Sequence, residues 1–291
     1  MTTLFDDGPR GRDSTFELLR TRPDLSPARA FLEQLWTQYE PYADRNFLTE
    51  FRNHIFPRYW EMYLACACLE QELQLRPRRN AAGPDVLIDT RSGCVAIEAV
   101  APEGGDDLDW PPLDTTIGFR LPEDEIIRRY TGVIRTKAKK FDVDLLAGRL
   151  QPVDLRVIAV NGINVPLSSA FEDVPRILKA VYPIHHCEAV FDPSGQLRVN
   201  WQADRHGLQT RAGSPIPTGI FLDREYTEVS AVLFSSVWPP DTRRPLGHDF
   251  IVAHNREALR PLPRGFWPYG KEFWYEGDAL CGQTWSTRAE S

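Results

Sequence analysis

The chain has 291 residues, of which 42% are hydrophobic, and its formal net charge is −7. The length fits one large domain or two small ones, and the apolar content is sufficient for a buried core. The negative charge argues against a protein that binds polyanions over its whole surface, although a local basic groove stays open.

The amino end and the cysteines indicate an expected compartment. Residues 1–12 are polar and lack the apolar stretch of a signal peptide. The longest apolar runs are far shorter than the ~20 residues that a membrane-spanning helix needs. Five cysteines, an odd number without a compact framework, predict reduced thiols. We therefore expect a cytoplasmic protein with no membrane partner.

The amino-terminal part predicts helices. Residues 1–25 are polar and interrupted by Pro and Gly, which predicts a loose tail with at most one short helix. Apolar residues then recur at helical spacing in three segments that begin near Ser26, Asn46 and Arg58. Ser26, followed by a proline, is expected to cap the first helix. Pro57 should end or kink the second.

A β-hairpin is predicted next. Residues 83–89 and 94–100 are apolar segments joined by a Ser-Gly turn. The second segment is apolar at nearly every position except Glu98. A lone carboxylate is costly to bury without a partner. Either a cation lies beside Glu98 or its pKa is raised, and a divalent metal shared with Asp85 would satisfy both acids.

The remaining elements are mixed. Residues 102–122 are acidic and Pro-rich and predict a loop, and helices over 123–141 and 169–181 flank a strand over 155–162. Four short strands are expected further on, over residues 187–191, 197–201, 229–234 and 249–253. We interpret the aromatic-rich end from residue 264 as a Pro-rich tail packed across the sheet. This order predicts a mixed α/β fold around one central sheet.

Three acids are candidates for one site. Glu61 lies on the helix before the hairpin, Asp85 opens the first hairpin strand, and Glu98 lies within the second. Acids that converge on a sheet edge form an oxygen-ligand site for Mg²⁺. The basic helix that follows offers Lys137 and Lys140, and a nearby lysine can orient water and offset the charge that develops on a phosphate.

This stretch resembles the PD-(D/E)XK nuclease superfamily, the restriction-endonuclease-like proteins. Glu61 matches the helical Glu of that family, Pro84-Asp85 matches its Pro-Asp, and Glu98 matches the second acid. The third element departs from the pattern, because Val100 stands where a Lys is expected. In some branches a following helix supplies that lysine, and Lys137 is our candidate for the migrated group. The resemblance covers about residues 59–160.

The resemblance implies a restriction-endonuclease-like mixed central sheet flanked by helices, with a β-rich elaboration at the carboxyl end. The nuclease-like domain would span residues 26–291, with a core over about 46–200 and the elaboration over about 201–291. The implied activity is metal-dependent hydrolysis of phosphodiester bonds, in DNA before RNA.

The resemblance also implies residue roles. Asp85 and Glu98 would ligate Mg²⁺, or Mn²⁺ in its place, and Glu61 would bind the metal directly or through water. Lys137 would position the attacking water. Nucleic acid is the implied partner, with Arg129 and Lys140 placed to contact it. The basic run at residues 76–79, with Arg78 and Arg79, directly precedes the site and is suited to a nucleic-acid backbone.

Alternatives stay open at this stage. Val100 and the acidic net charge favour an inactive nuclease-fold protein that serves as a binding or scaffold module, and the same acids would also suit a hydrolase of small phosphoesters. Lys139 or Lys140 is an alternative to Lys137 as the catalytic amine. A homodimer is compatible with the resemblance, because relatives of this fold pair to cut two strands. In the bland alternative, Glu61 only pairs with Arg58 on a solvated helix face, and the lysines are a solvated face as well.

Overall fold

The computed structural model describes residues 2–6, 11–78, 82–91, 93–104, 123–166, 174–184, 186–191, 197–202, 208–209, 215–216, 218–222, 224–241 and 243–286. The α-helices are α1 (Ser14–Thr21), α2 (Ser26–Tyr39), α3 (Phe47–Asn53), α4 (Ile55–Glu70), α5 (Glu123–Leu146) and α6 (Arg176–Val181). Short 3-10 turns cover Pro23–Leu25, Glu40–Tyr42, Ile220–Leu222 and Arg224–Tyr226.

The strands form one large mixed sheet and two small ones. The large sheet has eight strands in the order β1-β2-β3-β4-β9-β10-β11-β12. Its members are β1 (Gln74–Leu75), β2 (Val86–Thr90), β3 (Gly93–Val100), β4 (Leu155–Asn161), β9 (Ala231–Ser235), β10 (Ile251–His254), β11 (Gly270–Glu276) and β12 (Ala279–Trp285). The two-stranded sheets pair β5 (His186–Phe191) with β6 (Leu197–Gln202), and β7 (Leu208–Gln209) with β8 (Pro215–Ile216).

The large sheet is mixed: its centre is parallel, and its outermost strand pair at each end is antiparallel. β3 pairs with β4, and β4 with β9, in parallel, whereas β2 and β3 form an antiparallel hairpin. The chain between β3 and β4 contains α5, so these elements form a β-α-β crossover. This mixed sheet with helices confirms the α/β class predicted from the order of elements.

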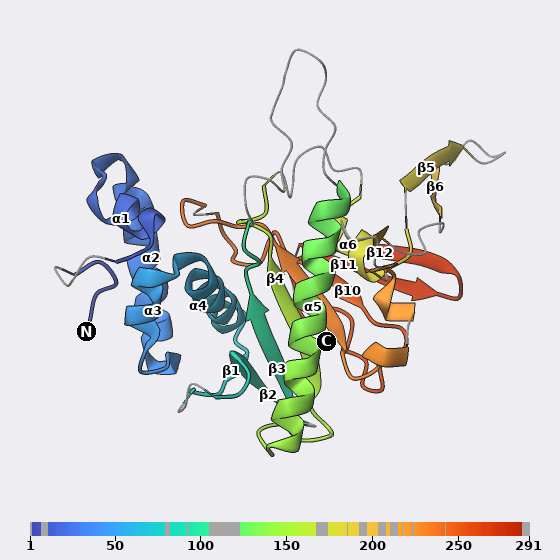
Figure 1. The fold of residues 1–291 in the computed structure, drawn as a ribbon, viewed down its shortest axis with the longest axis horizontal. Coiled ribbons are helices and arrows are strands. Elements are labelled where there is room, and N and C mark those ends of the chain that lie inside the picture. Colours follow the sequence, from blue (N-terminus) through green and yellow to red (C-terminus); the bar gives the residue numbers. More distant parts are fainter. Residues whose placement is uncertain are drawn as a thin grey trace, which may run out of the picture.

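Helices cover both faces of the sheet. Alternate residues of β3 and β4, such as Ile97 and Ala159, pack with α1 to α4 in one buried cluster. Their neighbours, such as Ala96 and Ile158, pack with α5 and α6 in a second cluster. Figure 1 shows α5 running over the central strands of the sheet, with α1 to α4 gathered at the left of the view. The period of two along each strand therefore separates two cores.

The predicted helices and hairpin form, with shifted ends. Pro57 neither ends nor kinks a helix but lies in the first turn of α4, where a missing N–H costs nothing. α2 begins at Ser26, and its cap is Leu25 without a side-chain hydrogen bond, so the predicted role of Ser26 is wrong. α6 is shorter than predicted and begins after Pro175, and residues 167–173 lie outside the described chain.

The amino-terminal segment contains one short helix, as the sequence allowed, but its described part is packed rather than loose. Phe16 and Leu19 of α1 are buried in the core formed by the first four helices. Asp13 fixes this segment twice, because Oδ1 accepts from the N–H of Thr15 and Oδ2 accepts from the N–H of Ile55 at the start of α4. Such capping contacts are visible in sequence only once the two helix starts are known to be adjacent.

The carboxyl-terminal aromatic segment is not a packed tail but two further strands. β11 pairs in parallel with β10, and β12 returns antiparallel to β11 after a turn at Gly277. Residues 231–285 thus contribute four strands to the same large sheet as the hairpin. In the described part of the chain, no helix has both the length and the apolar character needed to cross a membrane.

Candidate functional site

Glu61 is held in the interior by α4. Its side chain is only 4% exposed, and its carboxylate accepts hydrogen bonds from the Tyr39 hydroxyl at 2.6 Å and from Arg58 Nη1 at 2.8 Å. Arg78 Nη1 donates to the same carboxylate at 3.0 Å. Burial raises the pKa of Glu61, and the nearby Asp85 raises it further, against the pull of the two arginines. Glu61 does pair with Arg58, but not on a solvated helix face.

Asp85 directly precedes β2, at the open end of the β2–β3 hairpin. Its N–H donates to Ile97 O at 3.0 Å, and its Oδ2 accepts from Ala99 N–H at 2.9 Å. The side chain therefore continues the pairing of β3 by one step beyond β2. Arg78 Nη1 lies 3.3 Å from Oδ1, and Lys137 Nζ lies 3.4 Å from Oδ2. Asp85 thus contacts cations from both sides.

Glu98 is completely buried on the face of β3 that α5 covers. Lys137 Nζ donates to its Oε2 at 2.8 Å, and Lys140 Nζ donates to its Oε1. These lysines are three residues apart on α5, which places both amines on one helix face. Burial raises the pKa of Glu98, and Asp85 adds to this, while the two lysines oppose it.

Lys137 joins two of the predicted acids. Burial disfavours its charged form, but Asp85 and Glu98 outweigh that effect, so the pKa of Lys137 is raised. Lys140 also donates to Gly83 O at 2.8 Å and lies 3.3 Å from Asp144 Oδ2. The basic face of α5 is therefore turned toward the sheet at these two lysines, whereas Lys139 is exposed.

The whole site is a chain of alternating charges. Each acid contacts at least one base. The contacts run continuously from Asp44, in the turn before α3, to Asp144, near the end of α5. The acids are Asp44, Glu61, Asp85, Glu98 and Asp144, and the bases are Arg58, Arg78, Lys137, Lys140 and Arg149. Five carboxylates thus face five cations, and the cluster is close to neutral.

A cleft of about 290 Å³ opens over this cluster. It is lined by Glu50, His54, Pro57, Arg58, Glu61, Arg78, Asp85, Ala99 and Lys137. Two of the predicted acids and the predicted lysine therefore share one cleft. Glu98 lies beneath it, reached through the Lys137 amine.

The predicted nucleic-acid contact Arg129 lies away from this cleft. Arg129 Nη1 donates to Glu103 O at 3.1 Å, and its Nη2 lies 3.2 Å from Glu125 Oε1. It is two helical turns before Lys137 along α5. Arg79 lies outside the described residues. Arg78 is described, and it contacts acids of the site.

The acids have the donor chemistry for a divalent cation, but in this structure they are not arranged to hold one. Among the described residues, no group of three or more His, Cys, Asp or Glu side chains is placed to hold a metal ion. The chemistry of the donors suits Mg²⁺, since all are carboxylates. The oxygens that face one another, however, already bind a guanidinium or an ammonium group of the chain itself.

Several members of the cluster carried no sequence motif. Tyr39 and Asp44 come from the end of α2 and the turn after it, and only the folded chain brings them to Glu61 and its arginines. Arg58 and Asp144 had a detectable signal, because they stand at helical spacings from Glu61 and Lys140.

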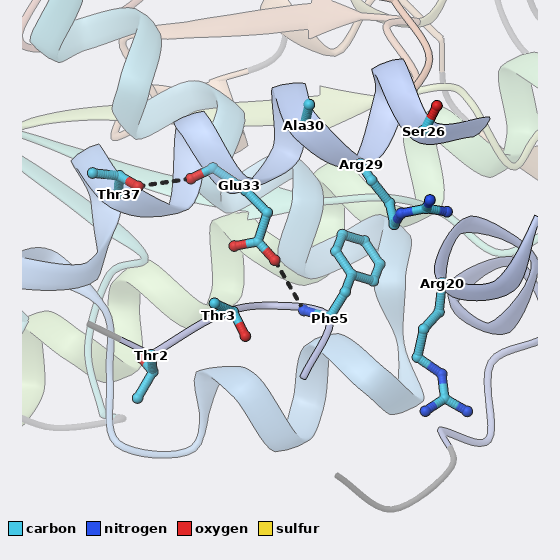
Figure 2. A pocket seen from close by; sticks show the side chains of 9 residues that line it. All are labelled: Thr2, Thr3, Phe5, Arg20, Ser26, Arg29, Ala30, Glu33 and Thr37. Atoms are coloured by element: carbon cyan, nitrogen blue, oxygen red, sulfur yellow. Dashed lines mark hydrogen bonds between the residues drawn. The ribbon is translucent and has the colours of Figure 1, made fainter. Parts of the chain in front are cut away.

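A larger hollow, of about 550 Å³, lies between residues 2–5 and α2. Figure 2 shows Glu33 at its centre, bonded to the backbone N–H of Phe5. Arg20 pairs with Glu17, and Arg29 donates to Leu19 O and Arg22 O. The charged groups of this hollow fix the chain's own segments, so we place the candidate site at the acid–base cluster.

Comparison of the chain with protein-family models, with curated proteins and with solved structures found no match, so what the cluster does is inferred from its own geometry.

Proposed function

We propose that this chain is a nuclease: a phosphodiester hydrolase that acts on DNA, and on RNA in second place, with Mg²⁺ or Mn²⁺ as cofactor. In this proposal the α/β fold is a restriction-endonuclease-like variant. The observation that carries it is the Lys137 amine, which lies between carboxylates of adjacent strands, 3.4 Å from Asp85 Oδ2 and 2.8 Å from Glu98 Oε2. The lysine comes from the helix after the hairpin, in place of Val100.

The side chains that line the cleft suit a phosphodiester. Arg58 and Arg78 present guanidinium groups, whose planar donors match phosphate oxygens. The raised pKa of Lys137 keeps its amine charged, so it would offset negative charge that develops on a phosphate. The side chain of Asp85 is 15% exposed, which lets water reach one acid of the pair. Nothing else in the described chain combines these groups beside an open cleft.

The test is a cleavage assay with supercoiled plasmid and with single-stranded DNA, in Mg²⁺ and in Mn²⁺. We expect wild-type protein to cut and Asp85→Asn to lose at least about a hundredfold in rate, as is typical for loss of one charge-stabilising group. Asp89→Asn is the matched control, because Asp89 lies on β2, which follows Asp85 directly, and pairs with Arg76 in solvent. Equal activity of Asp85→Asn and wild type would reject the site.

A specific observation also favours a second function, an inactive nuclease-fold protein that binds nucleic acid without cutting it. Each acid of the cluster already has a cationic partner within the chain. Such a protein would bind a duplex oligonucleotide but show no cleavage, and neither metal would raise its melting temperature. A metal-dependent rise in melting temperature that Asp85→Asn removes would instead favour the enzyme.

A further inference from the structure

One nitrogen atom of Arg78 lies among three carboxylates. Nη1 is 3.0 Å from Glu61 Oε1, 3.3 Å from Asp85 Oδ1 and 3.6 Å from Asp44 Oδ2. The three acids come from α4, from the residue before β2 and from the turn before α3, and this one nitrogen contacts all three. A positive charge thus stands at the point where the oxygens converge.

These acids need a cation in the free protein. The side chains of Asp44 and Glu61 are 2% and 4% exposed, so little water reaches them. Carboxylates brought this close repel one another and are costly to bury without compensation. Arg58 neutralises part of the charge, since its Nη1 lies 2.8 Å from Glu61 Oε2 and 3.3 Å from Asp44 Oδ2. Asp85 is reached by Arg78, whose Nη1 lies 3.3 Å from its Oδ1.

We propose that Arg78 is the internal counter-ion of Asp44, Glu61 and Asp85, and that it competes with a divalent metal for them. This inference rests on the proposed metal-dependent function. It makes Asp44 part of the acidic set and makes Arg78 a positioning residue that sets the metal affinity. It also explains why the acids are close together and yet not arranged to hold a metal.

Displacement of Arg78 from the acids would also couple metal binding to nucleic-acid binding. Arg78 cannot pair with the acids and with a phosphate through the same donors, so a phosphate that draws it away leaves the carboxylates available for the metal. By linkage, a metal that displaces Arg78 strengthens phosphate binding by the same factor. The free protein is therefore expected to bind metal weakly, and the nucleic-acid-bound protein to bind it more tightly.

The first experiment measures Mn²⁺ binding without nucleic acid, by the electron paramagnetic resonance signal of free Mn²⁺. We expect Arg78→Met to bind Mn²⁺ more tightly than wild type, by roughly 5- to 150-fold, the usual range of coupling between sites. Arg76→Met is the matched control, two residues away and paired with the exposed Asp89. A merely structural arginine would weaken binding when lost, so the direction of the change identifies the role.

The second experiment measures binding of a fluorescent duplex oligonucleotide by anisotropy in EDTA, where no cleavage occurs. Glu61→Gln removes the charge of a carboxylate that lies 3.0 Å from Arg78 Nη1 and should tighten DNA binding, whereas Arg78→Met should weaken it. Because the two variants are expected to change DNA affinity in opposite directions, misfolding of one of them would not produce the expected result. Glu61→Gln that leaves DNA affinity unchanged overturns the counter-ion role.

The outcomes separate this inference from the proposed function. Equal Mn²⁺ affinity of wild type and Arg78→Met, with both bound at an Asp85-dependent site, overturns the competition and leaves the nuclease standing. Absence of Asp85-dependent Mn²⁺ binding in every variant overturns both. Tighter binding in Arg78→Met supports the inference even if the protein cuts no DNA.

Discussion

At the scale of single residues, Glu98 shows how a buried carboxylate is accommodated. The sequence left open whether a cation lies beside it or its pKa is raised, and both are found. Its side chain is 0% exposed, with the amines of Lys137 and Lys140 in contact and the carboxylate of Asp85 nearby. Glu98 therefore stabilises the position of α5 only while the lysines stay with it.

The raised pKa of Glu98 predicts a pH dependence of stability. From about pH 4.3, where the unfolded carboxyl group titrates, up to its raised folded pKa, the folded state holds more protons than the unfolded state. The free energy of unfolding contributed by Glu98 therefore falls as pH rises through this window. Glu98→Gln should remove that negative contribution to the slope.

The measurement is urea unfolding in EDTA at a series of pH values, for wild type and Glu98→Gln. The slope of unfolding free energy against pH should be more negative for wild type than for the variant in this window. Asp89→Asn, an exposed carboxyl change, serves as control. A variant slope that is equal or more negative contradicts the assignment of the pKa direction.

At the scale of elements, the β11–β12 hairpin extends the sheet beyond the strands that the sequence predicted. β11 begins at Gly270, which has a φ of +93° and packs against the preceding strand. A Cβ at this position would lie 2.3 Å from the backbone oxygen of Phe250, which also accepts the N–H of Lys271. Only glycine allows this close approach of two strands.

This packing predicts different costs for two glycine substitutions. Gly277→Ala should be destabilised only by its φ of +59°, because nothing lies within 4 Å of the added Cβ. We expect the free energy of unfolding to fall by about 1 kcal/mol. Gly270→Ala is strained by its φ and must also displace a backbone carbonyl. We expect its free energy of unfolding to fall by about 4 kcal/mol or more. Urea unfolding of both variants is the measurement. Similar destabilisation by the two would show that β11 and β10 do not approach this closely.

Particular residues show how far the sequence could predict these elements and the site. The hairpin and the lysines of α5 follow from local patterns, namely apolar segments around a Ser-Gly turn and a basic helix face. β11 was missed because Gly, Pro and bulky rings surround its short alternation. Tyr39 and Asp44 were missed because their role depends on contacts with α4 and residue 78, which no local pattern records.

At the scale of the whole molecule, two cores share one sheet. The buried Trp36, Trp60 and Trp267 belong to the core on the side of α1 to α4, and α5 belongs to the other. The Trp60 indole N–H donates to Ala159 O of β4 at 2.9 Å, which ties α4 to the centre of the sheet. Both helical layers pack on the same strands, so the loss of either layer would expose a face of the sheet on which the other layer depends.

The shared sheet predicts that both cores unfold together. Tryptophan fluorescence, to which the buried Trp36, Trp60 and Trp267 of the first core contribute, and amide hydrogen exchange of α5, which packs in the second core, should report the same urea midpoint. Coincidence would support the single domain inferred from the sequence. Loss of α5 protection at clearly lower urea than the fluorescence change would instead divide the chain into two folding units.

Asp13 carries a consequence for any shortened form of the protein. Its two carboxylate oxygens hold the starts of α1 and α4 together, and α4 is the helix that presents Glu61. A protease cut or a later start codon that removes residue 13 would therefore do more than trim a surface segment. It would free the first turn of the helix that bears an acid of the cleft, although residue 13 does not itself line that cleft.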